Sequence, residues 1–337
     1  MATRVAINGF GRIGRSYLRA VLGNPSITVV AINDLTPPAT NAHLLKYDST
    51  QGVLGLDVSH SDDAITVGDQ VIKIYAQRNP ADLPWGELDI DVVIESTGFF
   101  TSREKAAAHL DAGAKKVIIS APATEVDGTF VVGVNDDTYD AATQHIVSNA
   151  SCTTNCFVPM VKVLDDAVGI VTGLMTTVHA YTNDQSLLDV AHPDLRRARA
   201  AAVNIVPSST GAARATSLVL EAMKGKLDGT SLRVPVQDGS ITDFTAIVRT
   251  TTVEEINEAF KAAAEGPLKG ILVYTDEPIV SSDIVGSPAS CTFDSKMTMV
   301  QKINDEQSLV KIFGWYDNEW GYSNRLVSLT EVIGRAS

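Results

Sequence analysis

Apolar residues in the first part of the chain form short runs separated by amphipathic segments. The segment that follows Gly14 ends at Gly23, and the segment 103–113 also ends at a glycine, so both have the pattern of helices. Strands that alternate with helices favour a parallel, doubly wound α/β sheet. We predict such a domain over residues 1–150. The runs that predict its strands lie at 4–8, 27–33, 71–76, 92–95, 116–120, 129–134 and 145–148.

Beyond this point the pattern changes to consecutive strands with few helices. A mixed or antiparallel sheet in an α+β domain is therefore expected over residues 151–317, and a terminal helix at 318–337 is expected to return to the first domain. Pro159 should kink or shorten the first helix of this domain. The helices are predicted at 152–167, 210–223 and 253–265, and the strands at 170–182, 230–236, 241–250, 271–275, 289–294, 297–303 and 309–316.

The composition is that of an ordinary soluble protein. Its 337 residues suggest about two domains, and 45% of them are hydrophobic while 20% are charged. The formal net charge of −13 disfavours nucleic acid as a partner, because that binding needs a broad basic surface. Three cysteines form no disulfide framework, and the sequence contains neither a signal peptide nor a membrane-length apolar run. A cytoplasmic protein without a nucleic-acid or membrane partner is therefore expected.

Three glycines between the first predicted strand and helix form a G-x-G-x-x-G motif. Gly9 permits the tight turn, Gly11 lets a pyrophosphate approach the backbone, and Gly14 allows close packing of helix on strand. The start of the helix offers free N–H groups to the phosphates. Asp34 ends the next strand, where a carboxylate can accept hydrogen bonds from both ribose hydroxyls and repel a 2′-phosphate. The alternative is a glycine turn with a helix-capping Asp, but the whole context predicts NAD binding to a Rossmann sheet.

Two of the three cysteines stand four residues apart in S-N-A-S-C-T-T-N-C. They could be a metal pair, a redox pair, a nucleophile with a neighbour, or core residues. Cys152 lies at the start of a predicted helix, capped by Asn149 or Ser151, where free N–H groups and the helix dipole lower a thiol's pKa. Cys156, one turn further on, is expected to face the core. The spacing is not that of a redox pair, and Cys291 with the scattered histidines completes no metal-ligand pattern, so no metal site is predicted.

Long motifs extend over nearly the whole chain. They are N-G-F-G-R-I-G-R (8–15), I-N-D-L (32–35), H-L-L-K-Y-D-S (43–49), S-T-G (96–98), S-N-A-S-C-T-T-N-C (148–156), M-T-T-V-H-A-Y-T-N-D-Q (175–185), L-R-R-A-R-A-A (195–201), S-T-G-A-A (209–213), L-R-V-P (232–235) and W-Y-D-N-E-W-G-Y-S (315–323). In this order they resemble the motifs of bacterial, phosphorylating glyceraldehyde-3-phosphate dehydrogenase. The resemblance implies an NAD-dependent enzyme of glycolysis or gluconeogenesis, with a Rossmann domain, an α+β catalytic domain and a homotetramer that uses the Arg-rich loop 180–209.

By this resemblance Cys152 is the nucleophile and His179 its base. The thiolate, held in an ion pair with the imidazole, adds to the aldehyde of glyceraldehyde 3-phosphate and gives a hemithioacetal. Hydride passes from that carbon to the nicotinamide and leaves a thioester, which inorganic phosphate cleaves to 1,3-bisphosphoglycerate. His179 handles the proton of the hemithioacetal hydroxyl, and the Cys152 N–H helps to stabilise the oxyanion. Without the motif, a lone histidine in a strand is more often structural.

The resemblance also supplies residues for two phosphates and for the cofactor. Arginine forks, hydroxyl groups and N–H groups at helix starts suit phosphate oxygens and would give an acidic protein local positive charge. Thr182 and Arg233 resemble the substrate-phosphate site, and Arg197 resembles a residue near both phosphates. The inorganic-phosphate site would comprise Ser151, Thr153, Thr210 and Gly211. The cofactor residues would be Gly9, Gly11, Arg12, Ile13, Gly14 and Asp34 from the glycine motif, and Arg78, Ser120 and Asn318 by resemblance, with Asn318 on the nicotinamide amide.

Three stretches depart from the family's usual pattern. L-D-V-A-H-P-D carries Ala191 where a proline is usual, which could leave space for a 2′-phosphate, so weak use of NADP beside NAD is expected. Ser208-Ser209 and V-Q-D-G-S-I-T-D-F (236–244) lie near the expected phosphate sites and suggest a second isozyme that resists thiol-directed inhibitors. The rival functions are erythrose-4-phosphate dehydrogenase, aspartate-semialdehyde dehydrogenase and a non-catalytic nucleotide-binding or redox-sensing module.

Overall fold

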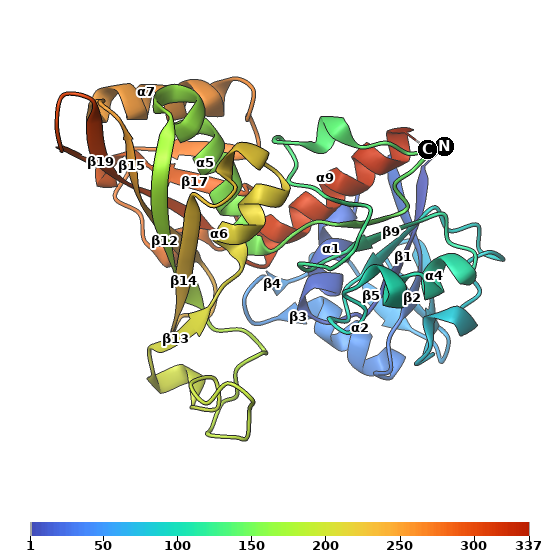
Figure 1. Ribbon diagram of the computed structural model, residues 1–337. Helices are drawn as coiled ribbons and strands as arrows, with labels where there is room; N and C mark the ends of the chain where they lie inside the picture. Colours follow the sequence, from blue (N-terminus) through green and yellow to red (C-terminus); the bar gives the residue numbers. More distant parts are fainter. Residues whose placement is uncertain (1, 337) are drawn as a thin grey trace. The chain divides into compact units, whose positions relative to one another are not determined.

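The computed structural model describes residues 2–336, which form two compact units. The first unit comprises the chain up to Phe130, Asp136–Ser151 and the chain from Ser323. The second unit comprises Val131–Asn135 and Cys152–Tyr322. Each unit is built on its own large sheet (Figure 1).

The large sheet of the first unit is predominantly parallel. Its order is β10-β11-β9-β8-β1-β2-β7-β6-β5; the pairs from β10 to β7 are parallel, and β6 and β5 extend one edge as antiparallel strands. Because the chain winds outward in both directions from β1, the predicted Rossmann fold is confirmed. The strands are β1 (Thr3–Asn8), β2 (Ile27–Asn33), β5 (Val58–His60), β6 (Ala64–Val67), β7 (Gln70–Tyr75), β8 (Val92–Glu95), β9 (Lys116–Ile119), β10 (Gly128–Thr129) and β11 (Ile146–Ser148).

Helices pack on this sheet and close its core. The hydroxyl of Tyr17, on α1, lies 3.1 Å from Oγ1 of Thr330, on α9, and both residues are buried. This contact attaches the end of the chain to the first unit, where Figure 1 shows α9 in red. The helices are α1 (Arg12–Val21), α2 (Pro38–Lys46), α3 (Arg103–Ala106), α4 (Ala108–Asp111) and α9 (Trp320–Ala336), and a small hairpin joins β3 (Tyr47–Asp48) to β4 (Gly52–Val53).

Some elements of the first unit differ from their prediction. The predicted strand 129–134 pairs only as β10, because the chain then turns, with Val131 N–H bonded to the Asn135 side chain at 2.9 Å. The predicted helix 103–113 is divided into α3 and α4 at Ala107. Helix α2 was not predicted, because its apolar residues do not form a helical stripe; the proline at its first position was the available signal.

The second unit contains the mixed sheet expected from the sequence. Its order is β13-β14-β12-β15-β19-β17-β16, with β18 paired to β19. β14 runs parallel to β12, whereas β15 runs antiparallel to both β12 and β19. The strands are β12 (Ile170–Ala180), β13 (Val206–Ser209), β14 (Leu227–Val234), β15 (Ser240–Arg249), β16 (Leu272–Thr275), β17 (Cys291–Asp294), β18 (Met299–Lys302) and β19 (Gln307–Tyr316).

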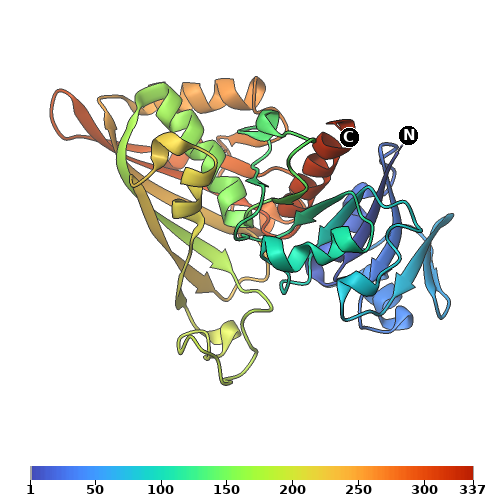
Figure 2. The ribbon, with the colours of Figure 1, turned by 45° about the vertical axis from the view of Figure 1, so that its right-hand side comes forward.

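Three helices cover one face of this sheet: α5 (Cys152–Val168), α6 (Ala212–Ala215) and α7 (Val253–Glu265) (Figures 1 and 2). Pro159 does not shorten α5, which buries most of its residues against the sheet. The predicted helix 210–223 is instead the short α6 followed by two 3₁₀ turns. A further short helix is α8 (Ser281–Ile284).

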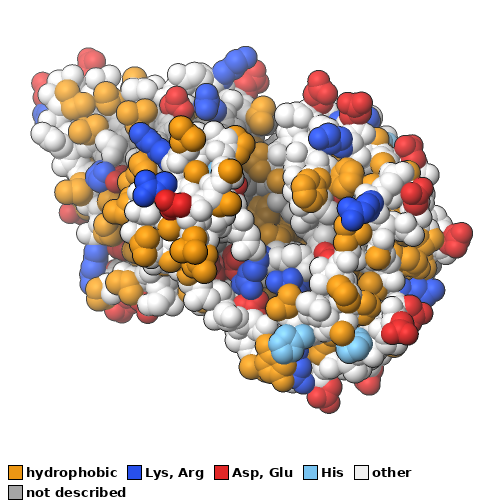
Figure 3. All heavy atoms as spheres, turned by 90° about the horizontal axis from the view of Figure 1, so that it is seen from below, with side chains coloured by type: hydrophobic (Ala, Val, Ile, Leu, Met, Phe, Trp, Pro, Cys, Tyr) orange, Lys and Arg blue, Asp and Glu red, His pale blue; other side chains and the backbone are white. Residues whose placement is uncertain are grey.

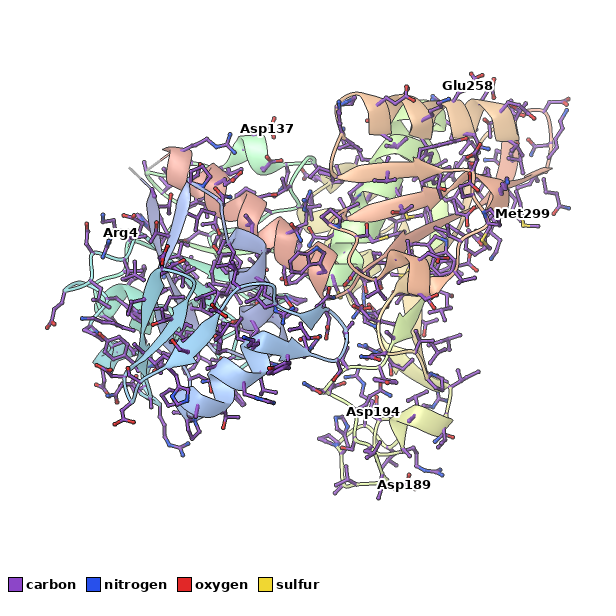
Figure 4. The ribbon with its side chains drawn as sticks, turned by 180° about the vertical axis from the view of Figure 1, so that it is seen from behind. Arg4, Asp137, Asp189, Asp194, Glu258 and Met299 are labelled. Atoms are coloured by element: carbon purple, nitrogen blue, oxygen red, sulfur yellow. The ribbon has the colours of Figure 1, made fainter. Side chains whose placement is uncertain are left out.

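A long segment without regular strands connects β12 to β13. Figure 1 shows it in yellow-green as an extended loop, and Figure 4 labels Asp189 and Asp194 on it. Its apolar side chains are largely exposed, with Leu187 at 77% and Leu195 at 81%. None of the helices within residues 2–336 has the length and apolar character needed to cross a membrane.

Candidate active site

The glycine motif turns the chain from β1 into α1 through contacts that leave no room for side chains. Gly9 has a φ of +91°, and a Cβ on it would stand 2.7 Å from the backbone N of Thr97. A Cβ on Gly14 would stand 2.2 Å from the carbonyl O of Gly9, so the helix lies directly on the turn. Among the described residues, no atom lies within 4 Å of the Cβ position on Gly11. These spaces suit the three roles expected from the sequence.

A cleft of about 460 Å³ opens beside this turn, at the carboxyl ends of β1, β2 and β8. Asp34 lies in its wall, where Oδ2 accepts a hydrogen bond from the Phe10 N–H at 2.7 Å and Oδ1 accepts one from the Thr36 N–H at 2.8 Å. The carboxylate is therefore held in place and keeps acceptor capacity for ribose hydroxyls. A cleft at this edge of a doubly wound sheet is the usual place for a dinucleotide. Its other lining residues include Gly9, Gly11, Asn33, Leu35, Gln77, Arg78, Ser96, Phe99 and Phe100.

The other cofactor candidates do not line this cleft. Arg12 forms an ion pair with Asp48, and Ile13 follows it in the first turn of α1. Ser120 follows β9, and its N–H donates to the carbonyl O of Glu95 at 2.9 Å. Asn318 belongs to the second unit. The sequence-predicted cofactor residues that line the cleft are thus Gly9, Gly11, Asp34 and Arg78.

A chain of buried polar side chains lies beneath the cleft. Nε1–H of Trp85 donates to Nδ1 of His109 at 3.0 Å, which assigns the ring proton of His109 to Nε2, 2.9 Å from Oε2 of Glu95. Glu95 also accepts from the Asn8 amide at 2.6 Å and from the N–H and hydroxyl of Thr97 at 2.8 and 2.5 Å. Asn8 and Thr97 line the cleft, so this chain connects its wall to the core.

In the second unit, the first residue of α5 meets the end of β12. Sγ of Cys152 lies 3.5 Å from Nε2 of His179, and the His179 side chain is buried. Ala150, just before the helix, has a φ of +55°, which is uncommon for a residue with a Cβ and marks a tightly set turn. The structure therefore brings together the two residues that the sequence analysis chose as nucleophile and base.

Burial governs the protonation of this pair. Burial, followed by the charge of Arg233, lowers the pKa of His179 to about 3, so its imidazole is neutral. Burial also raises the pKa of the Cys152 thiol, although Arg233 and hydrogen bonds from Thr153 act in the opposite direction. This corrects the expectation of a lowered thiol pKa and a preformed ion pair, because the loss of hydration outweighs the N–H groups at the helix start. Nδ1 of His179 lies 2.7 Å from the carbonyl O of Ala180, an acceptor that places the ring proton on Nδ1, so the thiol can pass its proton to Nε2 during attack.

Arg233 reaches the far side of the imidazole from the neighbouring strand. His179 and Arg233 are direct partners in the parallel register of β12 and β14. Nη1 of Arg233 lies 2.8 Å from Nδ1 of His179 and donates to the carbonyl O of Ala180 at 3.1 Å. The side chain expected to bind the substrate phosphate is therefore placed beside the expected base.

A row of buried hydroxyl groups extends from Thr177 through Tyr316 to Thr153, the residue that follows Cys152. The Tyr316 hydroxyl lies 2.8 Å from Oγ1 of Thr177 and 2.8 Å from Oγ1 of Thr153, and all three residues are buried. The N–H and the hydroxyl of Thr153 both act to lower the pKa of the Cys152 thiol, against the larger effect of burial. Burial raises the pKa of Tyr316, so it remains a neutral phenol that can donate to Thr153. The Thr177 hydroxyl donates to the carbonyl O of Ile241 at 3.4 Å, so it can accept from the Tyr316 hydroxyl.

Further anion candidates lie where the long loop meets α6. Nη1 of Arg197 donates to Oδ2 of Asp184 at 2.7 Å, and Nη2 donates to the carbonyl O of Ser209 at 3.5 Å. The latter contact brings Arg197 beside Thr210 and Gly211, which precede α6. The Thr210 hydroxyl accepts from the Ala212 N–H at 3.2 Å. Thr182 begins the long loop, and Ser151 is the residue before α5.

Asn318 lies between β19 and α9 and is buried. Its Oδ1 accepts from the Ser240 hydroxyl at 2.8 Å, and Ser240 Oγ accepts from the Ala180 N–H at 3.0 Å. This contact fixes which end of the amide faces Ser240, so the NH₂ group is the donor on the opposite side. Ala180 adjoins His179, so one hydrogen-bonded path joins the expected base to the expected nicotinamide residue.

Sequence reasoning missed the polar residues behind the functional ones. Asn8, Thr97, Tyr316 and Ser240 act through hydrogen bonds between segments that are far apart along the chain. The usable signal was topological: parallel strands present their carboxyl ends at one edge, so residues that follow β1, β2 and β8 converge there. No pattern local to the sequence pairs Tyr316 with Thr153. Among residues 2–336, no three histidine, cysteine or acidic side chains are grouped so as to hold a metal ion.

The two units therefore carry complementary chemistry. A dinucleotide cleft on a Rossmann sheet and a buried thiol beside an imidazole define the class of nicotinamide-dependent dehydrogenases that use a cysteine nucleophile. Comparison with known families gives the same class. Residues 3–103 match "Glyceraldehyde 3-phosphate dehydrogenase, NAD binding domain", and residues 151–318 match "Glyceraldehyde 3-phosphate dehydrogenase, C-terminal domain".

Full-length relatives make the family plain. The chain is 62% identical over 336 residues to glyceraldehyde-3-phosphate dehydrogenase 2 of Streptomyces avermitilis, with 99% of each chain covered. It is 62% identical over 337 residues to glyceraldehyde-3-phosphate dehydrogenase of Streptomyces coelicolor, again with 99% of each covered. It is 61% identical over 344 residues to that of Mycobacterium tuberculosis, with 100% of each covered. The chain belongs to the glyceraldehyde-3-phosphate dehydrogenase family.

Proposed function

We propose that the protein is an NAD-dependent, phosphorylating glyceraldehyde-3-phosphate dehydrogenase. It would convert D-glyceraldehyde 3-phosphate and inorganic phosphate to 1,3-bisphosphoglycerate, in glycolysis and gluconeogenesis. The observation that carries this proposal is the 3.5 Å contact between Sγ of Cys152 and Nε2 of His179, with Arg233 beside the ring. The family and the printed names of relatives that are 62% identical support the substrate.

His179 would move one proton in each step. Its neutral Nε2 takes the thiol proton as sulfur attacks the aldehyde carbon, and it returns that proton to the aldehyde oxygen to complete the hemithioacetal. Nε2 then takes the hydroxyl proton again as the carbon is oxidised to a thioester. NAD, when bound in the cleft, supplies the acceptor for the hydride that leaves this carbon. The N–H at the start of α5 stabilises negative charge on the oxygen.

The anion candidates would hold the two phosphates. Arg233 and Thr182 would bind the phosphate of the substrate, and Arg197 would serve both phosphates. Thr210 and Gly211, with Ser151 and the N–H of Thr153, would hold the attacking inorganic phosphate. The Thr153 hydroxyl is engaged with Tyr316, so it would contribute less to the anion than the sequence suggested.

The alternative function is erythrose-4-phosphate dehydrogenase, which shares the cysteine and the histidine but uses phosphate displacement poorly. The Arg197–Ser209 contact, which places a guanidinium beside Thr210 and Gly211, favours a second anion site and hence the phosphorylating enzyme.

Initial-rate assays separate the two. NADH formation from glyceraldehyde 3-phosphate should depend strongly on phosphate or arsenate, and erythrose 4-phosphate should be oxidised with lower kcat/KM. Cys152→Ser should lose nearly all activity while keeping NADH binding. Phosphate-independent turnover, or higher efficiency with erythrose 4-phosphate, would overturn the assignment.

We propose a preference for NAD, with weak use of NADP. Asp34 supports it, because a fixed carboxylate at the end of β2 would repel a 2′-phosphate. Ala191 gives the long loop a small side chain where a proline is usual, which would admit the larger cofactor weakly. Comparable kcat/KM values for the two cofactors would contradict this preference.

We further propose a cytoplasmic homotetramer without nucleic-acid or membrane partners. Apolar side chains on the long loop, such as Leu187 and Leu195, are too exposed for an isolated chain and would be covered by a second copy. Acidic and basic side chains are interspersed on the face drawn in Figure 3, which does not form the broad basic surface that nucleic acid needs. Light scattering after size exclusion should give four times the mass of 35.8 kDa, and a monomer would refute the assembly.

A further inference from the structure

Glu95, the last residue of β8, is a buried acidic residue with no part in the chemistry proposed above. Its side chain is 1% exposed. Oε1 lies against the N–H and the hydroxyl of Thr97, and Oε2 lies against the amide of Asn8 and the ring of His109. A carboxylate has only acceptors, whereas a neutral carboxylic acid also has a donor. The directions of these four hydrogen bonds therefore decide which form Glu95 takes.

The direction of the bond from Asn8 follows from the backbone at Gln77. The Gln77 N–H donates to Oδ1 of Asn33 at 2.8 Å, and Nδ2 of Asn33 donates to the Gln77 carbonyl O at 2.9 Å, so the two ends of this amide are assigned. Nδ2 of Asn33 also donates to Oδ1 of Asn8 at 2.7 Å. The NH₂ group of Asn8 must therefore face Glu95, to which it donates at 2.6 Å.

The other three neighbours of Glu95 are donors as well. The indole N–H of Trp85 occupies Nδ1 of His109, so Nε2 of this ring carries its proton toward Glu95. The Thr97 N–H can only donate, and the Thr97 hydroxyl accepts from the Phe99 N–H at 3.1 Å, which leaves its hydrogen for Oε1 of Glu95. Four donors stabilise the charged form, so Glu95 is a carboxylate.

The hydrogen bonds that start at Glu95 reach the wall of the dinucleotide cleft. Four residues of this network line the cleft, namely Asn8, Asn33, Gln77 and Thr97. Asn33 directly precedes Asp34, a cofactor candidate in the same wall. Gln77 likewise precedes the cofactor candidate Arg78. One buried carboxylate thereby links segments near the carboxyl ends of β1, β2, β7 and β8.

The segment that Glu95 holds also supports the glycine turn. The Ser96 hydroxyl donates to the carbonyl O of Gly9 at 2.7 Å, and a Cβ on Gly9 would stand 2.7 Å from the backbone N of Thr97. The backbone at Thr97 therefore packs directly on the turn that is expected to receive the pyrophosphate. A shift of Thr97 would displace this support.

We propose that Glu95 is a positioning residue for the cofactor. Its charge fixes the directions of the hydrogen bonds that hold the cleft wall and the glycine turn in the form that binds NAD. Glu95 itself does not line the cleft, so it acts through Asn8 and Thr97. Loss of the charge should weaken cofactor binding and leave the chemistry of the thiol and the imidazole unchanged. The inference rests on the proposed function, because it takes this cleft as the NAD site.

Glu95→Gln is the decisive variant, because glutamine keeps the shape but replaces one acceptor oxygen by a donor. Whichever way its amide lies, the NH₂ group meets two of the four donors. We expect the Kd of NAD, from isothermal titration calorimetry, and the KM for NAD to rise roughly tenfold, the loss of about one hydrogen bond to a charged group. The kcat at saturating NAD should stay near its native value. An unchanged Kd, or a fall in kcat without a change in Kd, would overturn the proposal.

Two substitutions of His109 give a second test, which does not depend on the folding of Glu95→Gln. In His109→Gln the amide can still accept from Trp85 and donate to Glu95, so the Kd of NAD should stay near its native value. His109→Leu removes the donor, so Kd should rise. Thr252→Ala controls for a general loss of stability, because it weakens the cap of α7 in the second unit and should leave Kd unchanged. Equal Kd values for the two His109 variants would overturn the proposal.

An exchange of the amide and the acid tests the bond directions without the cofactor. Asn8→Asp alone would place two carboxylates where the amide N and Oε2 are now 2.6 Å apart, and should lower Tm. When Asn8→Asp is combined with Glu95→Gln, the new amide can donate to the new carboxylate, which replaces an atom 3.4 Å from Nε2 of His109. The double variant should therefore have a higher Tm than Asn8→Asp. If the losses of the two single variants simply add, the directions are wrong and the proposal fails.

The native protein separates this inference from the proposed function. If native protein does not bind NAD in the calorimeter, the proposed NAD-dependent function itself fails. If native protein binds NAD and Glu95→Gln binds it equally tightly, only the positioning role of Glu95 fails.

Discussion

Replacement of Thr153 by valine tests the hydroxyl group of the residue next to Cys152, the proposed nucleophile. Valine keeps the branched shape at the second position of α5 but removes the hydroxyl that pairs with Tyr316 at 2.8 Å and lowers the pKa of Cys152. A thiolate gains more from a hydroxyl donor than a thiol does, because hydrogen bonds to charged acceptors are stronger. The substitution should therefore raise the pKa of Cys152 above its native value.

The size of the effect follows from one hydrogen bond. A bond to a charged group contributes roughly 1.5–3 kcal/mol and a bond between neutral groups about 0.5–1.5 kcal/mol. The difference of about 1–1.5 kcal/mol corresponds to about one pKa unit. At a fixed pH below the pKa, a reaction that consumes the thiolate should slow about tenfold.

The assay is the second-order rate constant for alkylation of Cys152 by iodoacetamide as a function of pH. Mass spectrometry of the peptide identifies the modified sulfur, and Cys156 and Cys291 should not compete because both are buried. Near-ultraviolet circular dichroism shows whether Thr153→Val keeps the native packing. If this folded variant and the native protein titrate with the same midpoint, the hydroxyl of Thr153 does not stabilise the thiolate and the reasoning fails.

Four further substitutions test other parts of the structure. Gly14→Ala should lower Tm and abolish NAD binding, because its Cβ would stand 2.2 Å from the Gly9 carbonyl O. Gly11→Ala should weaken NAD binding with little change in Tm. Calorimetry with and without NAD measures both effects, and similar Tm values for the two variants would contradict the expected difference. Asp34→Gly should raise kcat/KM for NADP relative to NAD by at least roughly tenfold, because it removes a negative charge that repels the 2′-phosphate. Initial rates with both cofactors give this ratio, and an unchanged ratio would disprove the role of Asp34. Thr252→Ala should lower the free energy of unfolding by about 1 kcal/mol, since its hydroxyl caps α7 through the Glu255 N–H, and an unchanged urea midpoint would count against the cap.

The sequence pattern predicted the elements whose signals are local. The helix 253–265 was predicted from its amphipathic periodicity with the bounds of α7, which in the structure begins after the capping box at Thr252 and ends at Gly266. The glycine motif predicted the turn between β1 and α1, because Gly9 and Gly14 each stand where a Cβ would meet backbone and Gly11 leaves open space. Cys156 was expected in the core and lies there, fully buried beside Met160.

Other features depend on contacts that no local pattern encodes. The predicted helix 210–223 becomes α6 and two 3₁₀ turns, although its helical periodicity is good, because tertiary packing overrides propensity. The thiol pKa was misjudged, since the sequence shows the helix start but not the burial that opposes it. Arg233 reaches His179 only through the register of β12 with β14, which the sequence does not specify.

The hydrogen bonds among Trp85, His109 and Glu95 constrain how this chain can diverge. Leucine in place of His109 would leave the indole N–H without its acceptor in the core and would remove a donor from Glu95, at a cost of about 1–3 kcal/mol for each stranded group. A phenylalanine at position 85 would relieve the first of these losses only. The effects of substitutions at these three positions therefore depend on one another. Relatives in which one of the three residues differs should also differ at the other two.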